Sequence, residues 1–268
     1  MALVNGKAVQ TLSVHDRGLL YGDGLFETLA VRGGRPLQWP RHLARLKRGC
    51  ARLGIEAPDA EGLLEETLRV AAGARRAVVK IIVTRGAGAR GYRPGSGLTT
   101  RIVTLHPSPE HPPAYRRDGV AVRWCATRLG LNPALAGLKH LNRLEQVLAR
   151  AEWDDPDVAE GLMQDPDGNV IEGTMSNLFA ALGGELVTPD LSRCGVAGVM
   201  RERVLECAAA LAIPCRIRVL GPAELETARE IFLCNSLIGI WPVRRLGERN
   251  VPRGPLAPRL AAALAEEI

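Results

Sequence analysis

The sequence contains no long hydrophobic run, and its first residues do not predict a secretion signal. No apolar stretch among its 268 residues reaches the roughly 20 residues that a membrane-spanning helix needs. Its start, MALVNGKAVQTL, lacks the basic end and the apolar stretch of a signal peptide. We therefore expect a cytoplasmic protein that does not contact a membrane.

Cysteine and histidine are few and scattered. The six cysteines include no C-x-x-C pair, and the five histidines are equally dispersed. A structural zinc site needs closely spaced ligands of these types, and disulfide frameworks are typical of small secreted domains. The sequence therefore predicts reduced thiols and no metal centre.

Aromatic residues make up only 4% of the chain, which bears on the meaning of its net charge of +6. Proteins that bind nucleic acid usually concentrate positive charge in a stripe with interleaved aromatic side chains. Here the arginines are spread along the whole sequence. We expect no nucleic-acid partner. An arginine-rich surface accounts for the charge, with weak attraction of a small anionic substrate as the alternative.

Lysine is unusually scarce. Four lysines, Lys7, Lys47, Lys80 and Lys139, stand against 31 arginines. Arginine stays protonated in proteins, whereas a desolvated lysine amine can lose its proton and act as a base or a nucleophile. A lysine in this sequence is therefore a candidate for chemistry, with a solvated surface position as the competing interpretation.

Two of these lysines stand in contexts that could desolvate them. Lys139 follows a segment rich in glycine and proline, and leucines at 138, 141, 144 and 148 predict that it stands at the entrance of an amphipathic helix. Lys80 lies in an apolar run, residues 77–84, that predicts a buried strand. Because strand alternation favours a solvent-facing Lys80, Lys139 is the stronger candidate.

The remaining pattern predicts two α/β halves. Strands or hairpins are expected at residues 3–12, 25–38, 77–84, 100–105, 120–125, 160–172, 178–181, 186–187, 216–219, 230–234 and 241–244, and helices at 41–53, 61–72, 198–211 and from 258 to the end. Four prolines within residues 106–113 predict a stiff connector. We expect a small N-terminal domain (1–106), a proline-rich linker (107–118) and a larger C-terminal domain (119–268).

One apparent nucleotide-binding motif can be rejected. Residues 86–91 match G-x-G-x-x-G after a predicted strand, but the dinucleotide fingerprint requires a helix to start there. The sequence that follows, YRPGSG, cannot form a helix. We therefore predict a loop that carries Arg90 and Tyr92.

Several polar features accompany Lys139, and each of them alone is common in proteins. They are Glu172 at the end of a hairpin strand, a glycine-rich turn (195–198) before a helix that starts with Val199 and Met200, Asn235 and Ser236 after an apolar strand, and Arg45 one helical turn from His42. Together they supply an amine, a carboxylate, a guanidinium and a helix N-terminus that can bind phosphate.

In this order and context the residues resemble the fold-type IV family of pyridoxal-phosphate enzymes. The resemblance extends from Tyr21-Gly22-Asp23-Gly24-Leu25-Phe26-Glu27 to Val243. Within the family, residues 139–146 (KHLNRLEQ) resemble the aminodeoxychorismate lyase branch. Branched-chain aminotransferases place a tyrosine five residues beyond the lysine, where this chain has Leu144. The family implies an α/β (α+β) fold with a small N-terminal α/β domain and a larger C-terminal domain around a β-barrel-like sheet.

The resemblance also implies a role for each candidate residue. Catalytic roles would fall to Lys139, which would bind pyridoxal 5'-phosphate covalently and then act as a base, and to Thr28. The other cofactor contacts would be Glu172 at the pyridine nitrogen, and Arg45, Val199, Met200 and Ser236 at the phosphate. The substrate would be bound by Arg90, Asn235 and Tyr92.

The implied function is a lyase of folate biosynthesis that converts 4-amino-4-deoxychorismate to 4-aminobenzoate and pyruvate. Such an enzyme would act on a small dicarboxylate and would be a homodimer. The alternative is a D-amino-acid or branched-chain aminotransferase with the same residues. A binding protein without catalysis is disfavoured because all the cofactor positions are filled.

Overall fold

The computed structural model describes residues 1–95 and 98–265. The chain divides into two compact units, which we call the first unit (residues 1–109 and 138–142) and the second unit (residues 110–137 and 143–268). The domain boundaries expected from the sequence remain a prediction. The two compact units differ from the expected domains in that residues 138–142 belong to the first unit. The last residues of the predicted C-terminal helix, 266–268, lie outside the described residues.

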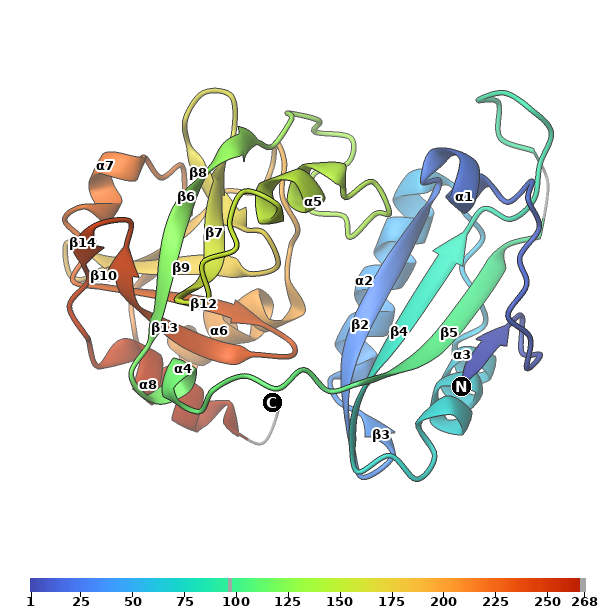
Figure 1. Ribbon diagram of the computed structural model, residues 1–268, viewed down its shortest axis with the longest axis horizontal. Coiled ribbons are helices and arrows are strands. Elements are labelled where there is room, and N and C mark those ends of the chain that lie inside the picture. The colour runs from blue at the N-terminus through green and yellow to red at the C-terminus, as the bar shows by residue number, and fades with distance from the viewer. Residues whose placement is uncertain (96–97, 266–268) are drawn as a thin grey trace. The chain divides into compact units, whose positions relative to one another are not determined.

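The first unit is an antiparallel sheet with two longer helices on one face (Figure 1). Its strand order is β1-β5-β4-β2-β3. The elements are β1 (Ala2–Val4), α1 (Arg17–Tyr21), β2 (Gly24–Arg32), β3 (Arg35–Pro36), α2 (Trp39–Leu53), α3 (Ala60–Ala71), β4 (Arg76–Thr84) and β5 (Thr100–Pro107).

Alternation along β2 determines which side chains meet the helices. Leu25, Leu29 and Val31 are buried, as is Glu27 between them. Phe26 and Thr28 point to the opposite face and are half-buried. The period of two therefore places a carboxylate among apolar side chains, on the face that α2 covers.

The second unit is built on a nine-stranded mixed sheet with the order β11-β10-β9-β12-β13-β6-β7-β8, and β14 is added to β13. Its elements are α4 (Ala114–Arg117), β6 (Val120–Arg128), α5 (Leu144–Arg150), β7 (Val158–Gln164), β8 (Val170–Gly173), β9 (Asn177–Leu182), β10 (Glu185–Pro189), α6 (Val199–Ala210), β11 (Cys215–Arg218), α7 (Pro222–Leu225), β12 (Glu230–Asn235), β13 (Gly239–Leu246), β14 (Arg249–Asn250) and α8 (Leu256–Ala263).

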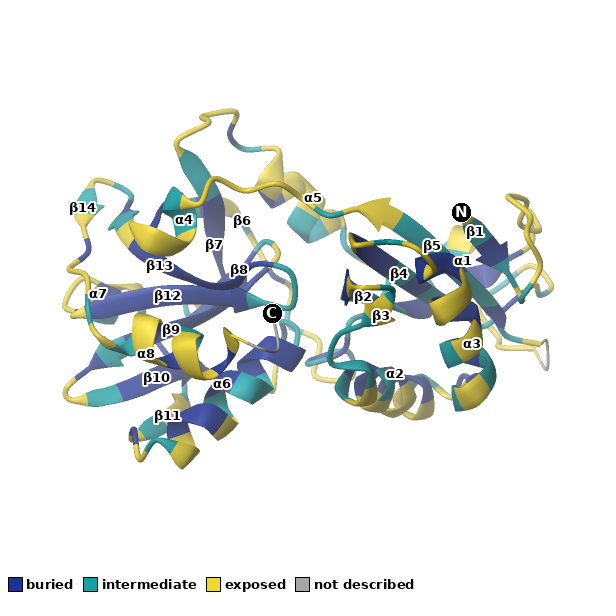
Figure 2. Cartoon of the chain, turned by 90° about the horizontal axis from the view of Figure 1, so that it is seen from below, coloured by how far each residue is buried: buried dark blue, intermediate teal, exposed yellow. Residues whose placement is uncertain are grey.

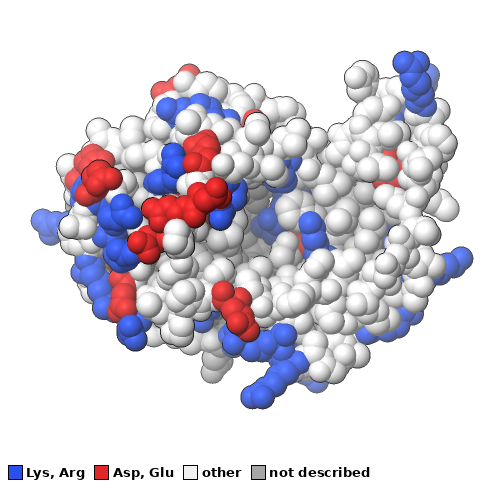
Figure 3. All heavy atoms as spheres, in the orientation of Figure 1, with Lys and Arg blue, Asp and Glu red and all other residues white. Residues whose placement is uncertain are grey.

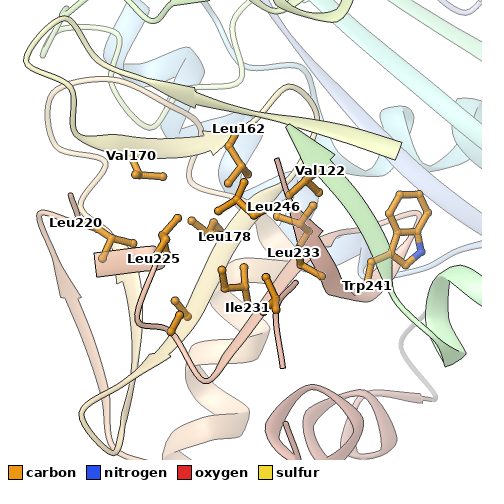
Figure 4. Close-up of a cluster of buried hydrophobic side chains, with 14 of the residues drawn as sticks. Val122, Leu162, Val170, Leu178, Leu220, Leu225, Ile231, Leu233, Trp241 and Leu246 are labelled. Carbon is orange, nitrogen blue, oxygen red and sulfur yellow. The ribbon is translucent and has the colours of Figure 1, made fainter. Parts of the chain in front are cut away.

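The sheet of the second unit encloses an apolar core. Buried side chains of its strands, among them Leu162, Leu178, Leu233 and Trp241, pack into one cluster (Figure 4). β12 is buried along nearly its whole length (Figure 2). Burial of each such large side chain contributes about 1.5–3 kcal/mol, so this core fixes the strand ends that carry the polar candidates.

Charged side chains of both signs occur on the surface of the second unit. Acidic and basic side chains are mixed on the visible face of the second unit (Figure 3). No helix in the described residues is long and apolar enough to cross a membrane. Within the same ranges, no group of three or more His, Cys, Asp or Glu side chains is placed to hold a metal ion.

The prediction that Lys139 opens a helix is wrong. α5 begins at Leu144, five residues later. Before it, the main chain of residues 138–142 pairs with the start of β2: Phe26 N–H donates to Lys139 O at 2.9 Å, and Leu141 N–H donates to Gly24 O at 3.0 Å. This long-range pairing satisfies the backbone groups that a helix would have used.

Other local predictions fared differently. The second arm of the first hairpin, residues 8–9, forms no strand, and β1 pairs with β5 instead. The hairpin predicted at 160–172 is confirmed by the antiparallel pair β7–β8. The loop predicted at the rejected G-x-G-x-x-G motif is also confirmed, since no helix starts in residues 86–91.

Candidate active site

Three of the predicted site residues lie around positions 26–28 of β2. The Nζ atom of Lys139 is 4.3 Å from the centroid of the Phe26 ring. Thr28 is on the same face of β2 as Phe26, two residues further along. Arg45, on α2, donates to Glu27 through Nε (2.8 Å to Oε1) and Nη2 (2.6 Å to Oε2). The first unit thus brings Lys139, Thr28 and Arg45 to one short stretch of strand.

Glu27 is the centre of a buried polar cluster on the helix side of β2. Besides the two bonds from Arg45, its Oε2 lies 2.6 Å from His42 Nδ1. Burial alone would raise the pKa of Glu27, but the charge and hydrogen bonds of Arg45, with His42, bring it down to about 2. His42 and Arg45 are three residues apart on α2, so they share the face that meets the carboxylate. The ion pair fixes the direction of the Arg45 guanidinium.

His42 is the neutral member of this cluster at neutral pH. Burial lowers the pKa of His42, and the charges of Arg45 and Lys139 lower it further against the opposing effect of Glu27. A neutral imidazole that donates from Nδ1 to Glu27 fits this direction. The cluster therefore contains one negative charge, on Glu27, and one positive charge, on Arg45. The charge of Lys139, in the neighbouring segment, helps to keep His42 neutral.

Lys80 also approaches Phe26. Its Nζ atom is 5.1 Å from the centroid of the same ring, and its backbone pairs with that of Thr28 across β2 and β4. The expectation that alternation turns Lys80 to solvent holds only in part, because the residue is half-buried. Two lysine Nζ atoms therefore lie near one aromatic ring in the first unit.

The predicted substrate residues Arg90 and Tyr92 lie in the loop after β4. Both side chains are exposed, and that of Tyr92 is 85% exposed. Main-chain atoms of this loop are held by α1, through Arg17 and Tyr21. The loop is thus ordered by its backbone while its side chains are presented to solvent.

In the second unit, Glu172 lies at the end of β8 and is 4% exposed. Its Oε2 accepts a hydrogen bond from Val196 N–H at 2.8 Å. The backbone of Gly195 (φ +85°) packs closely against Ile171, and an added Cβ would lie 2.8 Å from the Ile171 side chain. Burial lowers the pKa of Arg143, and the charge of Glu172 opposes that shift, so the two side chains interact electrostatically.

The same glycine turn leads into α6. Gly198 is the N-cap and has no side-chain cap, so the first amides of the helix, on Val199 and Met200, lack an intrahelical acceptor. An added Cβ at Gly198 would lie 2.0 Å from Asn177 Oδ1, which requires glycine there. The N-terminus of α6 therefore offers backbone N–H donors and the positive end of the helix dipole, and Gly198 has no side chain to obstruct a ligand. This arrangement is common at phosphate-binding sites.

Asn235 and Ser236 stand at the turn between β12 and β13. The Asn235 Oδ1 accepts from Leu237 N–H (2.8 Å) and Ile238 N–H (2.9 Å), and its Nδ2 donates to Met175 O at 3.0 Å. Asn235 therefore shapes the turn that carries the half-buried Ser236. It also ties that turn to the loop that follows Glu172.

Sequence reasoning missed Glu160, a buried acid on β7. Its carboxylate accepts hydrogen bonds from the Thr174 hydroxyl (2.5 Å), the Ser176 hydroxyl (2.9 Å) and Met175 N–H (3.1 Å). Burial raises the pKa of Glu160 against these hydrogen bonds. The signal that could have revealed it is an acid within a strand whose other positions, apart from the final Gln164, are apolar or glycine.

Each of the two units carries donors or acceptors that suit part of pyridoxal phosphate. They comprise a lysine amine that contacts an aromatic ring, a buried carboxylate, an arginine and an uncapped helix N-terminus with a glycine at its cap. An aldehyde, a pyridine nitrogen and a phosphate are the groups that such a set can bind. The residues present therefore suit the cofactor that the resemblance implies.

Comparisons with known proteins agree with this fit. The sequence matches the amino-transferase class IV family over residues 24–246. It is 37% identical to an aminodeoxychorismate lyase of Vibrio harveyi, over 98% of this chain and 99% of that protein.

Two solved structures extend the likeness. A 4-amino-4-deoxychorismate lyase from Pseudomonas aeruginosa has a TM-score of 0.96 and 52% identity, and the match covers 100% of this chain and 99% of the other. A hypothetical aminotransferase from Mycobacterium tuberculosis in its PLP-bound form has a TM-score of 0.85 and 27% identity, over 100% and 98%. They confirm the predicted α/β (α+β) fold of the fold-type IV enzymes. This protein therefore belongs to the amino-transferase class IV family, whose cofactor is pyridoxal 5'-phosphate.

Proposed function

We propose that this enzyme is a lyase that converts 4-amino-4-deoxychorismate to 4-aminobenzoate and pyruvate, a reaction of folate biosynthesis. The observation that carries the proposal is the 52% identity, over the whole chain, to a structure of such a lyase. The buried Glu172 and the placement of Lys139 against Phe26 support it, because the reaction needs a carboxylate and an amine.

The chemistry asks for few protein groups. When bound, pyridoxal phosphate supplies an electron-accepting ring next to the carbon that carries the substrate's amine. Lys139 would hold the cofactor, and its free amine would take the proton from that carbon. The C–O bond to the enolpyruvyl group then breaks, and the departing group takes up a proton to become pyruvate. The remaining ring becomes aromatic, which makes the step favourable.

The direct test is product release from authentic substrate. We expect equal amounts of pyruvate and 4-aminobenzoate from 4-amino-4-deoxychorismate, and much slower transamination of D-alanine or branched-chain amino acids. The second candidate, an aminotransferase, is favoured by the likeness to the Mycobacterium tuberculosis structure. A preference for an amino acid and a 2-oxo acid would establish that candidate instead.

We infer that the phosphate is held by Arg45, the Ser236 hydroxyl and the first amides of α6, those of Val199 and Met200. Replacing Arg45 with methionine should raise the cofactor concentration for half-saturation about 10- to 100-fold, since a charge-assisted hydrogen bond is lost. Titration of cofactor-free protein, followed by absorbance, measures this change.

A matched control separates direct contact from loss of the ion pair. Glu27→Gln removes the charge that pairs with Arg45 but keeps an oxygen that can accept from it. We expect near-normal cofactor affinity in Glu27→Gln. An equal loss in both variants would mean that Arg45 acts only through the buried cluster, and normal affinity in Arg45→Met would remove Arg45 from the phosphate site.

We propose that four residues, Arg90, Tyr92, Asn235 and Thr28, bind the substrate or assist departure of the enolpyruvyl group. Arg90 can pair with a carboxylate, Tyr92 and Asn235 can orient the substrate, and the Thr28 hydroxyl can relay a proton. These roles are supported by the resemblance and, for Thr28, by its place beside Phe26 on β2.

Thr28→Val tests the relay, because it removes the hydroxyl and nearly keeps the shape. We expect 4-aminobenzoate formation to fall about 100-fold, the lower range for a positioned acid or base. The absorbance of the bound cofactor should not change, since Lys139 remains. Normal turnover would identify Thr28 as an ordinary half-buried strand residue.

We further infer a cytoplasmic homodimer. The dimer is supported by exposed apolar side chains on α5, where Leu144, Val147 and Leu148 are 75%, 59% and 60% exposed. Such a face is suited to cover by a second copy. Sedimentation at several concentrations would give the oligomeric state.

A further inference from the structure

Arg17, at the start of α1, is an arginine that is only 4% exposed. Its Nε donates to Asp23 Oδ2 at 2.8 Å, its Nη1 to Gly91 O at 2.8 Å and its Nη2 to Tyr92 O at 3.1 Å. A buried guanidinium is costly unless it is paired, so these bonds are what keeps Arg17 in place. Its fork of donors spans two segments that lie far apart in the sequence.

Tyr21, at the end of α1, holds the same loop from its other side. The Tyr21 hydroxyl accepts from Gly91 N–H at 3.0 Å, and the Tyr21 and Tyr92 ring centroids are 5.5 Å apart. The Arg17 guanidinium carbon lies 4.8 Å from the Tyr21 ring centroid. Because the Tyr92 side chain is 85% exposed, the order of the loop comes from its main-chain bonds and not from buried side chains.

Asp23 links this arrangement to the segment that carries Lys139. The Asp23 carboxylate pairs with Arg17, and the residues on each side of it contact residues 138–142. Gly24 O accepts from Leu141 N–H at 3.0 Å, and Gly22 O accepts from Asn142 Nδ2 at 3.4 Å. Within the first unit, a short chain of contacts therefore runs from the Arg90 loop through Arg17 and Asp23 to the neighbours of Lys139.

We infer that Arg17 is a positioning residue for substrate binding: by holding the carbonyls of Gly91 and Tyr92, it sets the loop from which Arg90 reaches the substrate. The inference rests on the proposed function, which gives Arg90 and Tyr92 their substrate role. It goes beyond that proposal because the proposed function gives Arg17 no role in binding the cofactor or the substrate. A guanidinium suits this task, since one planar group bonds two successive carbonyls and a carboxylate.

Arg17→Met tests the inference, because methionine keeps most of the apolar stem and removes every donor. We expect KM for 4-amino-4-deoxychorismate to rise about 10- to 100-fold, with kcat changed far less and cofactor half-saturation unchanged. Arg17→Lys should restore part of the loss, because an ammonium can reach one carbonyl but not all three partners.

A second readout does not depend on activity. Trypsin cleaves after arginine, and the Arg90–Gly91 bond lies within the held loop. Cleavage at this bond, identified by fragment mass in cofactor-free and loaded protein, should be at least about tenfold faster in Arg17→Met. Tyr21→Phe should also speed cleavage, because Gly91 N–H loses its acceptor while the Arg17 bonds remain.

Arg85→Met is the matched control. Arg85 shares Asp23 with Arg17 through Nε (2.8 Å to Oδ2) and Nη2 (3.1 Å to Oδ1), but its remaining side-chain bonds go to Leu53 O and Gly54 O at the end of α2. We expect this variant to be less stable without a change in KM or in cleavage after Arg90. Equal effects of Arg85→Met and Arg17→Met would overturn the inference, because the Asp23 cluster would then serve only the stability of the fold.

A double-variant comparison separates failure of the inference from failure of the proposed function. If Arg17 acts through the loop, Arg17→Met/Arg90→Met should raise KM no more than Arg90→Met alone. An additive rise would overturn the inference. An unchanged KM in Arg90→Met would overturn the role proposed for Arg90, and unchanged cleavage in both Arg17→Met and Tyr21→Phe would overturn the role of Arg17.

Discussion

Replacing Lys139 with alanine is expected to lower the rate of 4-aminobenzoate formation by at least about 10⁴-fold. The side chain is proposed to serve twice, as the covalent anchor of the cofactor and as the base. The main-chain bond from Phe26 N–H to Lys139 O does not involve the side chain, so the segment should keep its place. The variant should still bind free cofactor through the phosphate contacts.

Borohydride reduction followed by peptide mapping identifies the anchoring lysine. In the native enzyme the pyridoxyl group should be found on Lys139 and should be absent from the alanine variant. Lys80 is the informative rival, since its Nζ is 5.1 Å from the centroid of the ring that Lys139 contacts. A label on Lys80 would refute the assignment. Lys47→Ala is the control, because Lys47 is exposed on α2 and its replacement should change neither the labelling nor the activity.

Local sequence patterns were sufficient where the structure is local. The Asp165-Pro166-Asp167-Gly168 turn predicted the β7–β8 hairpin, because both strands and the turn lie within a few residues of each other. The helix predicted at Lys139 failed for the opposite reason. Its backbone partners are in β2, more than 100 residues earlier, and no local pattern announces them.

The same distinction between local and long-range contacts applies to the buried polar side chains. Glu27 alternates with half-buried positions on β2, and His42 and Arg45 are three residues apart on α2, so a buried acid that faces a histidine and an arginine could have been deduced. Arg17 gave no such signal. Arginine is usually exposed, and the burial of Arg17 follows from carbonyls of a loop more than 70 residues away.

For Glu172→Gln we expect turnover to fall about 10²- to 10³-fold with little change in KM or cofactor affinity. A negative charge facing the pyridine nitrogen would keep that nitrogen protonated, which allows the ring to accept electrons when the proton leaves the substrate. Each tenfold loss corresponds to about 1.4 kcal/mol of transition-state stabilisation. The neutral amide removes that stabilisation while leaving the ground state nearly intact.

Glutamine is the substitution that removes the charge of Glu172 and keeps its hydrogen bond. Glu172 Oε2 accepts from Val196 N–H at 2.8 Å, in the glycine turn that leads to α6. A glutamine keeps a carbonyl oxygen for that bond, so the turn and the α6 amides should stay in place. Alanine would leave Val196 N–H without its acceptor and would confuse the two effects.

Two measurements on Glu172→Gln decide between the charge and the hydrogen bond. If the charge matters, a substrate deuterated at the carbon that bears the amine should react with a larger isotope effect than in the native enzyme, because proton removal limits the rate more strongly. Cofactor half-saturation should stay within about twofold. If turnover is normal and only thermal stability falls, Glu172 is a hairpin residue that holds the glycine turn, and the ring nitrogen must find its partner elsewhere.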